Sequence, residues 1–75
     1  MRKATRFSRY SFGRAVRRER EALELSQEEF AERAEVHRTY VSSIELGKVN
    51  VGIDVAGNLA RALGVRLSDL IAKAE

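Results

Sequence analysis

The 75-residue sequence predicts a compact all-α domain of five helices, and three observations support this prediction. Proline is absent, and the helix-forming residues Ala, Leu, Glu and Arg are abundant. Apolar residues recur at the spacing of a helix face. Cysteine is also absent, so helix packing or oligomerisation has to stabilise a chain that buries only about 60% of the surface exposed on unfolding.

The first helix is expected over about residues 12–23. Its apolar residues fall on one stripe, formed by Phe12, Ala15, Val16 and Leu23. Residues 1–11 have no such period and mix Arg, Lys, Ser and Thr. We therefore expect a basic flexible N-terminal arm over residues 1–11, followed by a single domain over residues 12–75.

The second helix has the clearest start, because Ser26-Gln27-Glu28-Glu29 is a capping box. In this motif the Ser26 oxygen accepts from the Glu29 amide, and the Glu29 carboxylate accepts from the Ser26 N–H. The residues expected to face inward are Phe30, Ala31 and Ala34. Val36 follows as a buried turn residue.

Glycines mark the ends of the next two expected helices. The third helix is expected over residues 38–46 and ends at Gly47, since glycine adopts positive φ readily. A fourth helix over residues 53–63 would end before Gly64 for the same reason. The fifth helix is expected to have Ser68 as its N-cap.

Positive charge is concentrated at the start of the chain. Residues 1–18 hold seven Lys or Arg and no acid, whereas residues 19–36 hold seven Glu and two Arg. This distribution can present a positive face to a polyanion, although a solvated basic tail is the simpler interpretation of the charge alone. No apolar run is long enough to span a bilayer or to act as a secretory signal, so we expect a cytoplasmic protein without a membrane partner.

Two short helices joined by a tight turn, over residues 27–47, predict a helix-turn-helix. This stretch resembles the helix-turn-helix of the phage-repressor and Cro (XRE) family, and the resemblance extends over about residues 12–71. It implies a lambda-repressor-like DNA-binding fold. The matching residues are Gln27, Phe30, Ala31, Ala34, Val36, Val41, Ile44, Glu45 and Gly47, with the segments LSQEEFA at 25–31 and ALGV at 62–65.

Two positions depart from the family pattern. Glu35 occupies a turn position where many members have glycine, and Val51-Gly52 stands where related chains often carry Pro-Ser. The alternative to a helix-turn-helix is a small helical bundle with the same core spacing. That alternative gives no reason for an arginine and three hydroxyl groups to gather on one helix.

The exposed face of the third helix is the predicted base-reading surface. In a helix-turn-helix, the amino-terminal part of the recognition helix enters the major groove. Arginine can donate two hydrogen bonds to guanine O6 and N7, and threonine can contact the methyl group of thymine. The predicted base contacts are Arg38, Thr39, Ser42 and Ser43.

Contacts to the DNA backbone are predicted to flank this helix. The resemblance implies that Gln27 donates to a phosphate, helped by the free amides at the helix N-terminus. The further phosphate candidates are His37, Tyr40, Lys48 and Arg17. Tyr40 is equally well explained as a core aromatic with its hydroxyl at the rim. The resemblance also implies a structural ion pair between Arg20 and Glu45.

The resemblance further implies a homodimer, since one recognition helix binds weakly. Four apolar residues in and before the fifth helix exceed what a small core needs, namely Val65, Leu67, Leu70 and Ile71. We therefore predict a two-fold dimer interface at these residues. Such a dimer would read a palindromic operator whose half-sites lie about 34 Å apart.

Together these observations predict a sequence-specific, double-stranded DNA-binding transcription regulator. Among small family members the chain is most similar to the controller proteins of restriction–modification systems. A phage-type repressor, an antitoxin and a protein–protein adaptor that has lost DNA binding remain alternatives. One histidine and no cysteine, with carboxylates on solvated faces, argue against an enzyme or a metal site. We expect no cofactor and no small-molecule effector.

Overall fold

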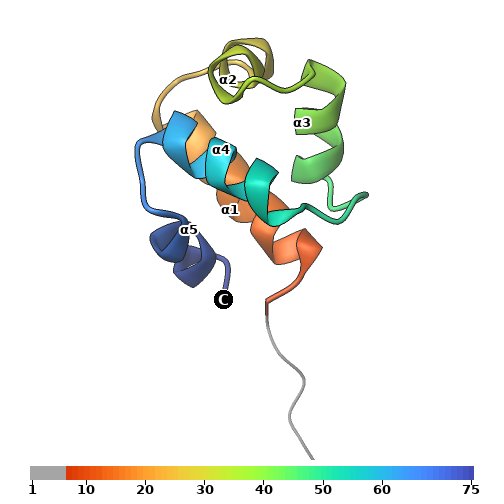
Figure 1. Ribbon diagram of the computed structural model, residues 1–75, viewed down its shortest axis with the longest axis vertical. Helices are drawn as coiled ribbons and strands as arrows, with labels where there is room; N and C mark the ends of the chain where they lie inside the picture. The colour runs from red at the N-terminus through yellow and green to blue at the C-terminus, as the bar shows by residue number, and fades with distance from the viewer. Residues whose placement is uncertain (1–6) are drawn as a thin grey trace, which may run out of the picture.

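Five α-helices and their loops make up the part of the chain that the computed structural model describes, residues 7–75 (Figure 1). The helices are α1 (Arg9–Ala22), α2 (Gln27–Ala34), α3 (Arg38–Glu45), α4 (Ile53–Leu63) and α5 (Leu67–Lys73). No strand occurs within residues 7–75, and the predicted all-α fold of five helices is confirmed. Residues 1–6, which fall in the predicted arm, lie outside the described residues.

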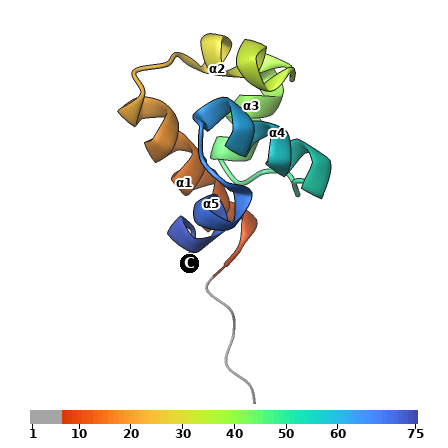
Figure 2. The same cartoon turned by 60° about the vertical axis from the view of Figure 1, so that its left-hand side comes forward.

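The core lies where all five helices meet. α1 and α4 cross each other. α2 and α3 pack at one end of this pair, and α5 lies against both α1 and α4 near the other end (Figures 1 and 2). Every helix contributes at least one fully buried large side chain, and these are Val16, Phe30, Val41, Ile44, Leu59 and Leu70. Burying one such side chain stabilises the fold by about 1.5–3 kcal/mol, so this shared core ties α3 firmly to the rest of the domain.

α1 begins earlier than the sequence pattern predicted, at Arg9 instead of Phe12. Ser8 is its N-cap: Ser8 Oγ accepts from the Ser11 N–H at 3.2 Å, and Ser11 Oγ accepts from the Ser8 N–H at 2.9 Å. The prediction missed this capping box because serine stands where glutamate or glutamine usually completes the motif. Residues 9–11 therefore belong to the helical domain and not to the arm predicted over residues 1–11.

The predicted start of α2 is confirmed. Ser26 Oγ accepts from the Glu29 N–H at 3.0 Å, and the Ser26 N–H donates to Glu29 Oε1 at 2.8 Å. α2 ends at Ala34, and its C-cap residue Glu35 has a left-handed backbone, with φ 61° and ψ 41°. This conformation costs an L-residue about 1–2 kcal/mol, which explains why glycine suits this turn.

α1 and α3 approach each other closely at Gly13. A Cβ atom at Gly13 would collide with the carbonyl oxygen of Ile44 and touch the backbone of Glu45. Only glycine permits this contact between the helix backbones. The apolar pattern did not predict this contact, because a residue without a side chain adds nothing to a hydrophobic stripe.

The start of α5 and the position of Leu70 require two corrections. α5 begins at Leu67 with Arg66 as its N-cap, so the prediction that Ser68 caps this helix is wrong. Leu70 is 0% exposed and fills the core, so it has no surface to offer a partner and its prediction as a dimer contact is also wrong. Gly64 does end α4, with φ 74°. None of the helices within residues 7–75 is long and apolar enough to cross a membrane.

Candidate nucleic-acid interface

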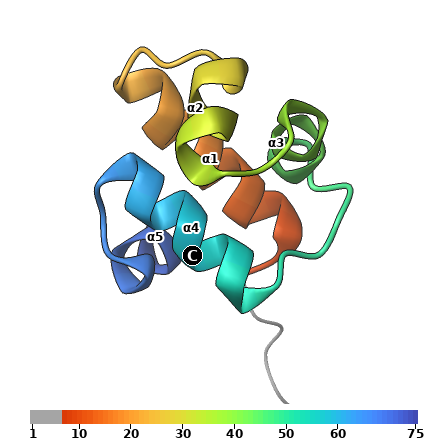
Figure 3. The same ribbon diagram turned by 45° about the horizontal axis from the view of Figure 1, so that its top comes forward.

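α3 has one buried side and one exposed side. Two of its side chains are completely enclosed by the core, Val41 and Ile44. No other described element covers the opposite side of α3, which lies at the edge of the molecule (Figures 1 and 3). Of the predicted base contacts, Arg38 and Thr39 are exposed, whereas Ser42 and Ser43 are half-buried. The first turn of α3 therefore offers an arginine and a threonine to any ligand on this side.

A buried hydrogen-bond network holds the carboxyl end of α3. Glu45 accepts from Arg20 through both carboxylate oxygens, with Nε to Oε2 at 2.7 Å and Nη2 to Oε1 at 3.0 Å. Gln27 Nε2 donates to the same Oε1 at 3.0 Å. The ion pair implied by the family resemblance is therefore present, and it connects α1, the start of α2 and the end of α3.

The Arg20 side chain remains charged in this environment. Its hydrogen bond to Glu45 raises the pKa of Arg20, and this effect outweighs desolvation, which lowers it. Nη1 of the same guanidinium donates to the carbonyl oxygen of Leu25 at 2.8 Å. A lysine has no planar fork of donors and could not bind the carboxylate and this carbonyl in the same way.

Three predicted phosphate contacts lie at or near the two ends of α3. His37 is the exposed N-cap of α3, and its side chain makes no capping hydrogen bond. Lys48 is exposed three residues after the last residue of α3. Tyr40 is half-buried and packs against the core, which agrees with the structural role that the sequence left open for it.

The other two predicted phosphate contacts already have partners within the chain. Gln27 donates to Glu45, but its amide group has a second N–H that this hydrogen bond does not use. Arg17 pairs with Glu21 at 3.0 Å on the surface of α1, where both side chains are more than half exposed. Exposed pairs of this kind contribute about 0.2–1 kcal/mol and exchange partners readily.

The sequence pattern missed Arg9 and Tyr10, which were assigned to the arm. Arg9 Nε donates to the carbonyl oxygen of Gly47 at 2.8 Å, so the first turn of α1 binds the segment that leaves α3. The Ser8 and Ser11 pair was the available signal, because it places the helix start before these residues. Within residues 7–75, no group of three or more His, Cys, Asp or Glu side chains could hold a metal ion.

Comparison with known proteins identifies the family. A family model described as helix-turn-helix matches residues 16–70, a span that includes α2, α3 and the turn between them. The chain belongs to the helix-turn-helix family. The exposed side of α3 is thus the outer face of the second helix of the motif. The hydrogen bonds that Glu45 accepts from Arg20 and Gln27 hold the carboxyl end of this helix against the domain.

Two curated relatives share this helix-turn-helix at high identity. Control protein C.BamHI of Bacillus amyloliquefaciens is 42% identical over 64 residues, which cover 84% of this chain and 79% of that protein. Control protein C.MunI of Mycoplasma sp is 42% identical over 65 residues, covering 85% and 88% of the two chains. The family predicted from the sequence, and its similarity to control proteins, are confirmed.

Two solved structures of regulators are similar to this chain in fold. The restriction-modification controller protein C.AhdI from Aeromonas hydrophila superposes with a TM-score of 0.81 at 35% identity, over 83% of this chain and 94% of that one. The clp gene regulator ClgR from Corynebacterium glutamicum gives a TM-score of 0.85 at 29% identity, over 88% and 70% of the chains. This protein is accordingly a helix-turn-helix transcription regulator.

Proposed function

We propose that this protein is a controller of the restriction–modification type, which binds a palindromic operator in double-stranded DNA as a homodimer. One observation carries the proposal: α3 exposes Arg38 and Thr39 in its first turn while its opposite side is locked into the core. Its similarity to two control proteins and to the controller C.AhdI supports the same conclusion. Binding, and not catalysis, is the proposed activity, and the cytoplasm is the proposed location.

The proposed base contacts differ in strength. Arg38 projects two donors that match guanine O6 and N7, and such a pair discriminates against the wrong base by about 1–3 kcal/mol. Thr39 offers a methyl group to thymine. Ser42 and Ser43 are half-buried, so they contribute only where a base edge comes close to α3.

The proposed phosphate contacts surround these residues. The second amide N–H of Gln27 and the amino end of α2 form one donor group, and His37 and Lys48 lie close to α3 in the chain. Arg17 can exchange its exposed partner Glu21 for a phosphate. The hydroxyl group of half-buried Tyr40 can donate from the rim of the core.

A hollow beside α5 is the proposed dimer interface. It has a volume of about 290 Å³, and its wall includes Phe12, Val51, Ala56, Leu67 and Ile71. Ile53 also borders it and is 77% exposed, which makes it the most exposed large hydrophobic residue within residues 7–75. A two-fold interface presents the same patch on both copies, so Ile53 of each copy can fill the hollow of the other. Val65, the remaining predicted dimer contact, is half-buried between α4 and α5.

Selection of bound DNA from a random pool at two salt concentrations tests the proposed function. We expect a palindromic sequence to be enriched, with an affinity that falls steeply as salt rises. Arg38→Ala should relax the preference at one base position of each half-site, whereas Gln27→Ala should weaken binding to all sequences alike. Arg61→Ala is the matched control, because Arg61 lies in the last turn of α4. This end of α4 points away from α3 (Figure 1).

Two outcomes would contradict the proposal. Absence of any enrichment at low salt would exclude a DNA-binding regulator and favour a protein–protein adaptor. Enrichment of a non-palindromic sequence by a monomer would exclude the proposed dimer. Sedimentation of the protein at several concentrations, with Ile53→Asp as the variant expected to dissociate, measures the dimer independently.

A further inference from the structure

The first turn of α1 contacts Gly47, in the loop that follows the recognition helix α3. Besides its hydrogen bond to Gly47, Arg9 lies over the ring of Tyr10, with 5.0 Å between Cζ and the ring centroid. Arg9 Nη2 donates to the Tyr10 hydroxyl oxygen at 3.4 Å. The Tyr10 ring occupies the space that a side chain at Gly47 would need, since a Cβ there would collide with it.

These contacts leave several donors unused. A guanidinium group has five N–H donors, and Arg9 uses only Nε and part of Nη2. The Tyr10 hydroxyl accepts from Arg9 and can still donate its own proton, and Tyr10 is 53% exposed. Lys48 is exposed next to Gly47. Its backbone N–H donates to the Ser43 carbonyl oxygen at 2.9 Å, which holds the main chain of this residue against α3. Within residues 7–75 neither Arg9 nor Lys48 belongs to an ion pair.

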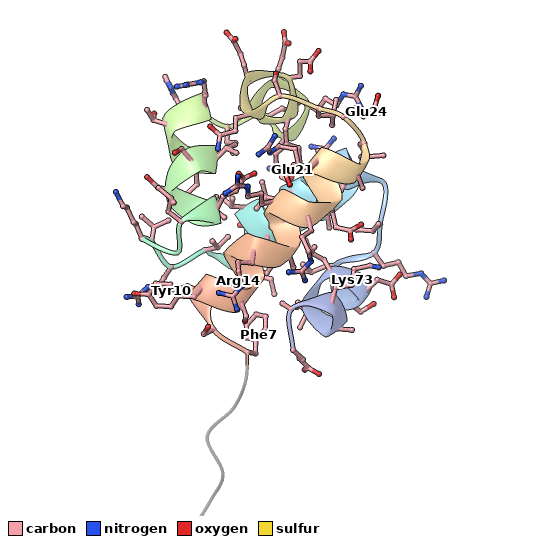
Figure 4. The ribbon with its side chains drawn as sticks, turned by 180° about the vertical axis from the view of Figure 1, so that it is seen from behind. Phe7, Tyr10, Arg14, Glu21, Glu24 and Lys73 are labelled. Atoms are coloured by element: carbon pink, nitrogen blue, oxygen red, sulfur yellow. The ribbon has the colours of Figure 1, made fainter. Side chains whose placement is uncertain are left out.

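The position of these donors relative to α3 indicates their ligand. Figure 4 shows Tyr10 on the same side of the molecule as α3, whereas Lys73 lies on the side of α5. α3 has eight residues, so it is about 12 Å long, comparable to the width of the major groove. When the first turn of such a helix contacts base edges, groups at its carboxyl end lie at the level of the sugar–phosphate backbone.

We propose that Arg9, Tyr10 and Lys48 form a phosphate-binding site at the carboxyl end of α3, called here the α1 corner. This proposal rests on the proposed DNA-binding function and adds Arg9 and Tyr10 to the residues that carry it. Arginine and phosphate match in geometry, and charge-assisted hydrogen bonds are the strongest of their kind. Because the Gly47 carbonyl already orients the guanidinium, little conformational freedom is lost on binding.

The α1 corner also links two parts of the site. Arg9 binds the backbone directly after α3, so a phosphate held by Arg9 is held at a fixed distance from the base-reading turn. α1 thereby sets how deeply α3 can enter the groove. The role of Arg9 is thus partly to bind phosphate and partly to position α3.

The test measures dissociation constants for the selected operator and for unrelated DNA over a range of salt concentrations. Arg9→Gln and Lys48→Gln should each weaken binding to both DNAs by roughly tenfold. Each should also reduce the magnitude of the slope of log affinity against log salt by about 1. Tyr10→Phe removes a neutral donor but keeps the ring on Gly47, so it should weaken binding about threefold without changing the slope. Arg61→Gln removes the same charge elsewhere on the surface and is the control. It should leave the dissociation constants for both DNAs unchanged.

Unfolding in urea, run on each variant, separates binding from folding. If Arg9→Gln lowers stability but leaves the salt slope unchanged, the corner is only structural and the proposal is overturned. If all three variants bind like the wild type while Arg38→Ala still changes base preference, the corner is overturned and the proposed function stands. If the wild type itself binds no DNA, the proposed function fails first.

Discussion

Arg20 and Glu45 form a two-pronged ion pair that is almost sealed from water, with 9% and 7% of their surfaces exposed. The two hydrogen bonds measure 2.7 Å and 3.0 Å, and they join α1 to the last residue of α3. Because Arg20 also holds the Leu25 carbonyl, one guanidinium sets the positions of three segments. The orientation of the recognition helix therefore depends on the buried guanidinium group of Arg20, which is not part of the exposed side of α3.

Glu45→Ala should lower the free energy of unfolding by about 3–5 kcal/mol, because it leaves the Arg20 charge buried without a partner. Urea unfolding followed by circular dichroism measures this change. Arg17→Ala is the control, since it breaks an ion pair whose two side chains are 58% and 52% exposed. It should cost less than about 1 kcal/mol. Equal losses in the two variants would show that burial of the pair does not matter.

Gly13→Ala should destabilise the domain by about 1–3 kcal/mol, because the new methyl group meets the Ile44 carbonyl oxygen at the crossing of α1 and α3. Gly57→Ala provides the opposite case, since a Cβ at Gly57 in α4 meets nothing within 4 Å. It should stabilise by about 0.5–1 kcal/mol through helix propensity. Thermal unfolding compares the two, and a stabilising Gly13→Ala would refute the close crossing.

Glu35→Gly should raise the free energy of unfolding by about 0.5–1 kcal/mol. Relief of the left-handed backbone, about 1–2 kcal/mol, exceeds the entropic cost of glycine in the unfolded chain, about 0.5–1 kcal/mol. Glu32→Gly removes the same charge from the interior of α2 and should instead cost about 1 kcal/mol. Urea titration distinguishes the signs, and a loss of stability in both variants would contradict the assigned strain.

The capping box of α2 should weaken in acid. The Ser26 N–H, and then the Ser26 hydroxyl, lower the pKa of Glu29 below its ordinary value of 4.5. A lowered pKa means that the folded state releases this proton more easily than the unfolded state does. The stabilisation is therefore complete above pH 4.5 and is lost as pH falls through the lowered pKa of the folded protein.

Comparison of Glu29→Ala with the wild type over this pH range measures that effect. The stability difference should be constant near neutral pH and shrink below pH 4.5. Glu28→Ala is the matched control, because Glu28 lies in the same first turn of α2 without the capping role. If both variants lose their difference from the wild type equally, the dipole of the helix and not the Ser26 hydrogen bonds is the cause.

Much of the fold followed from local patterns in the sequence. The Ser26 capping box located the start of α2, Gly64 located the end of α4, and the spacing of Val41 and Ile44 showed which side of α3 is buried. These features are determined by residues within one or two helical turns of each other, which is why they can be predicted. The family resemblance supplied the Arg20–Glu45 pair, which no local pattern would have shown.

The sequence alone determined that the chain forms five helices, contains a helix-turn-helix, and presents Arg38 and Thr39 on the outer face of α3. Only the tertiary structure decided that Leu70 belongs to the core, that Gly13 permits the approach of α1 to α3, and that Arg9 binds Gly47. Each of these depends on contacts between segments far apart in the chain. Such contacts are set by how the helices pack together, and periodicity within one helix carries no information about them.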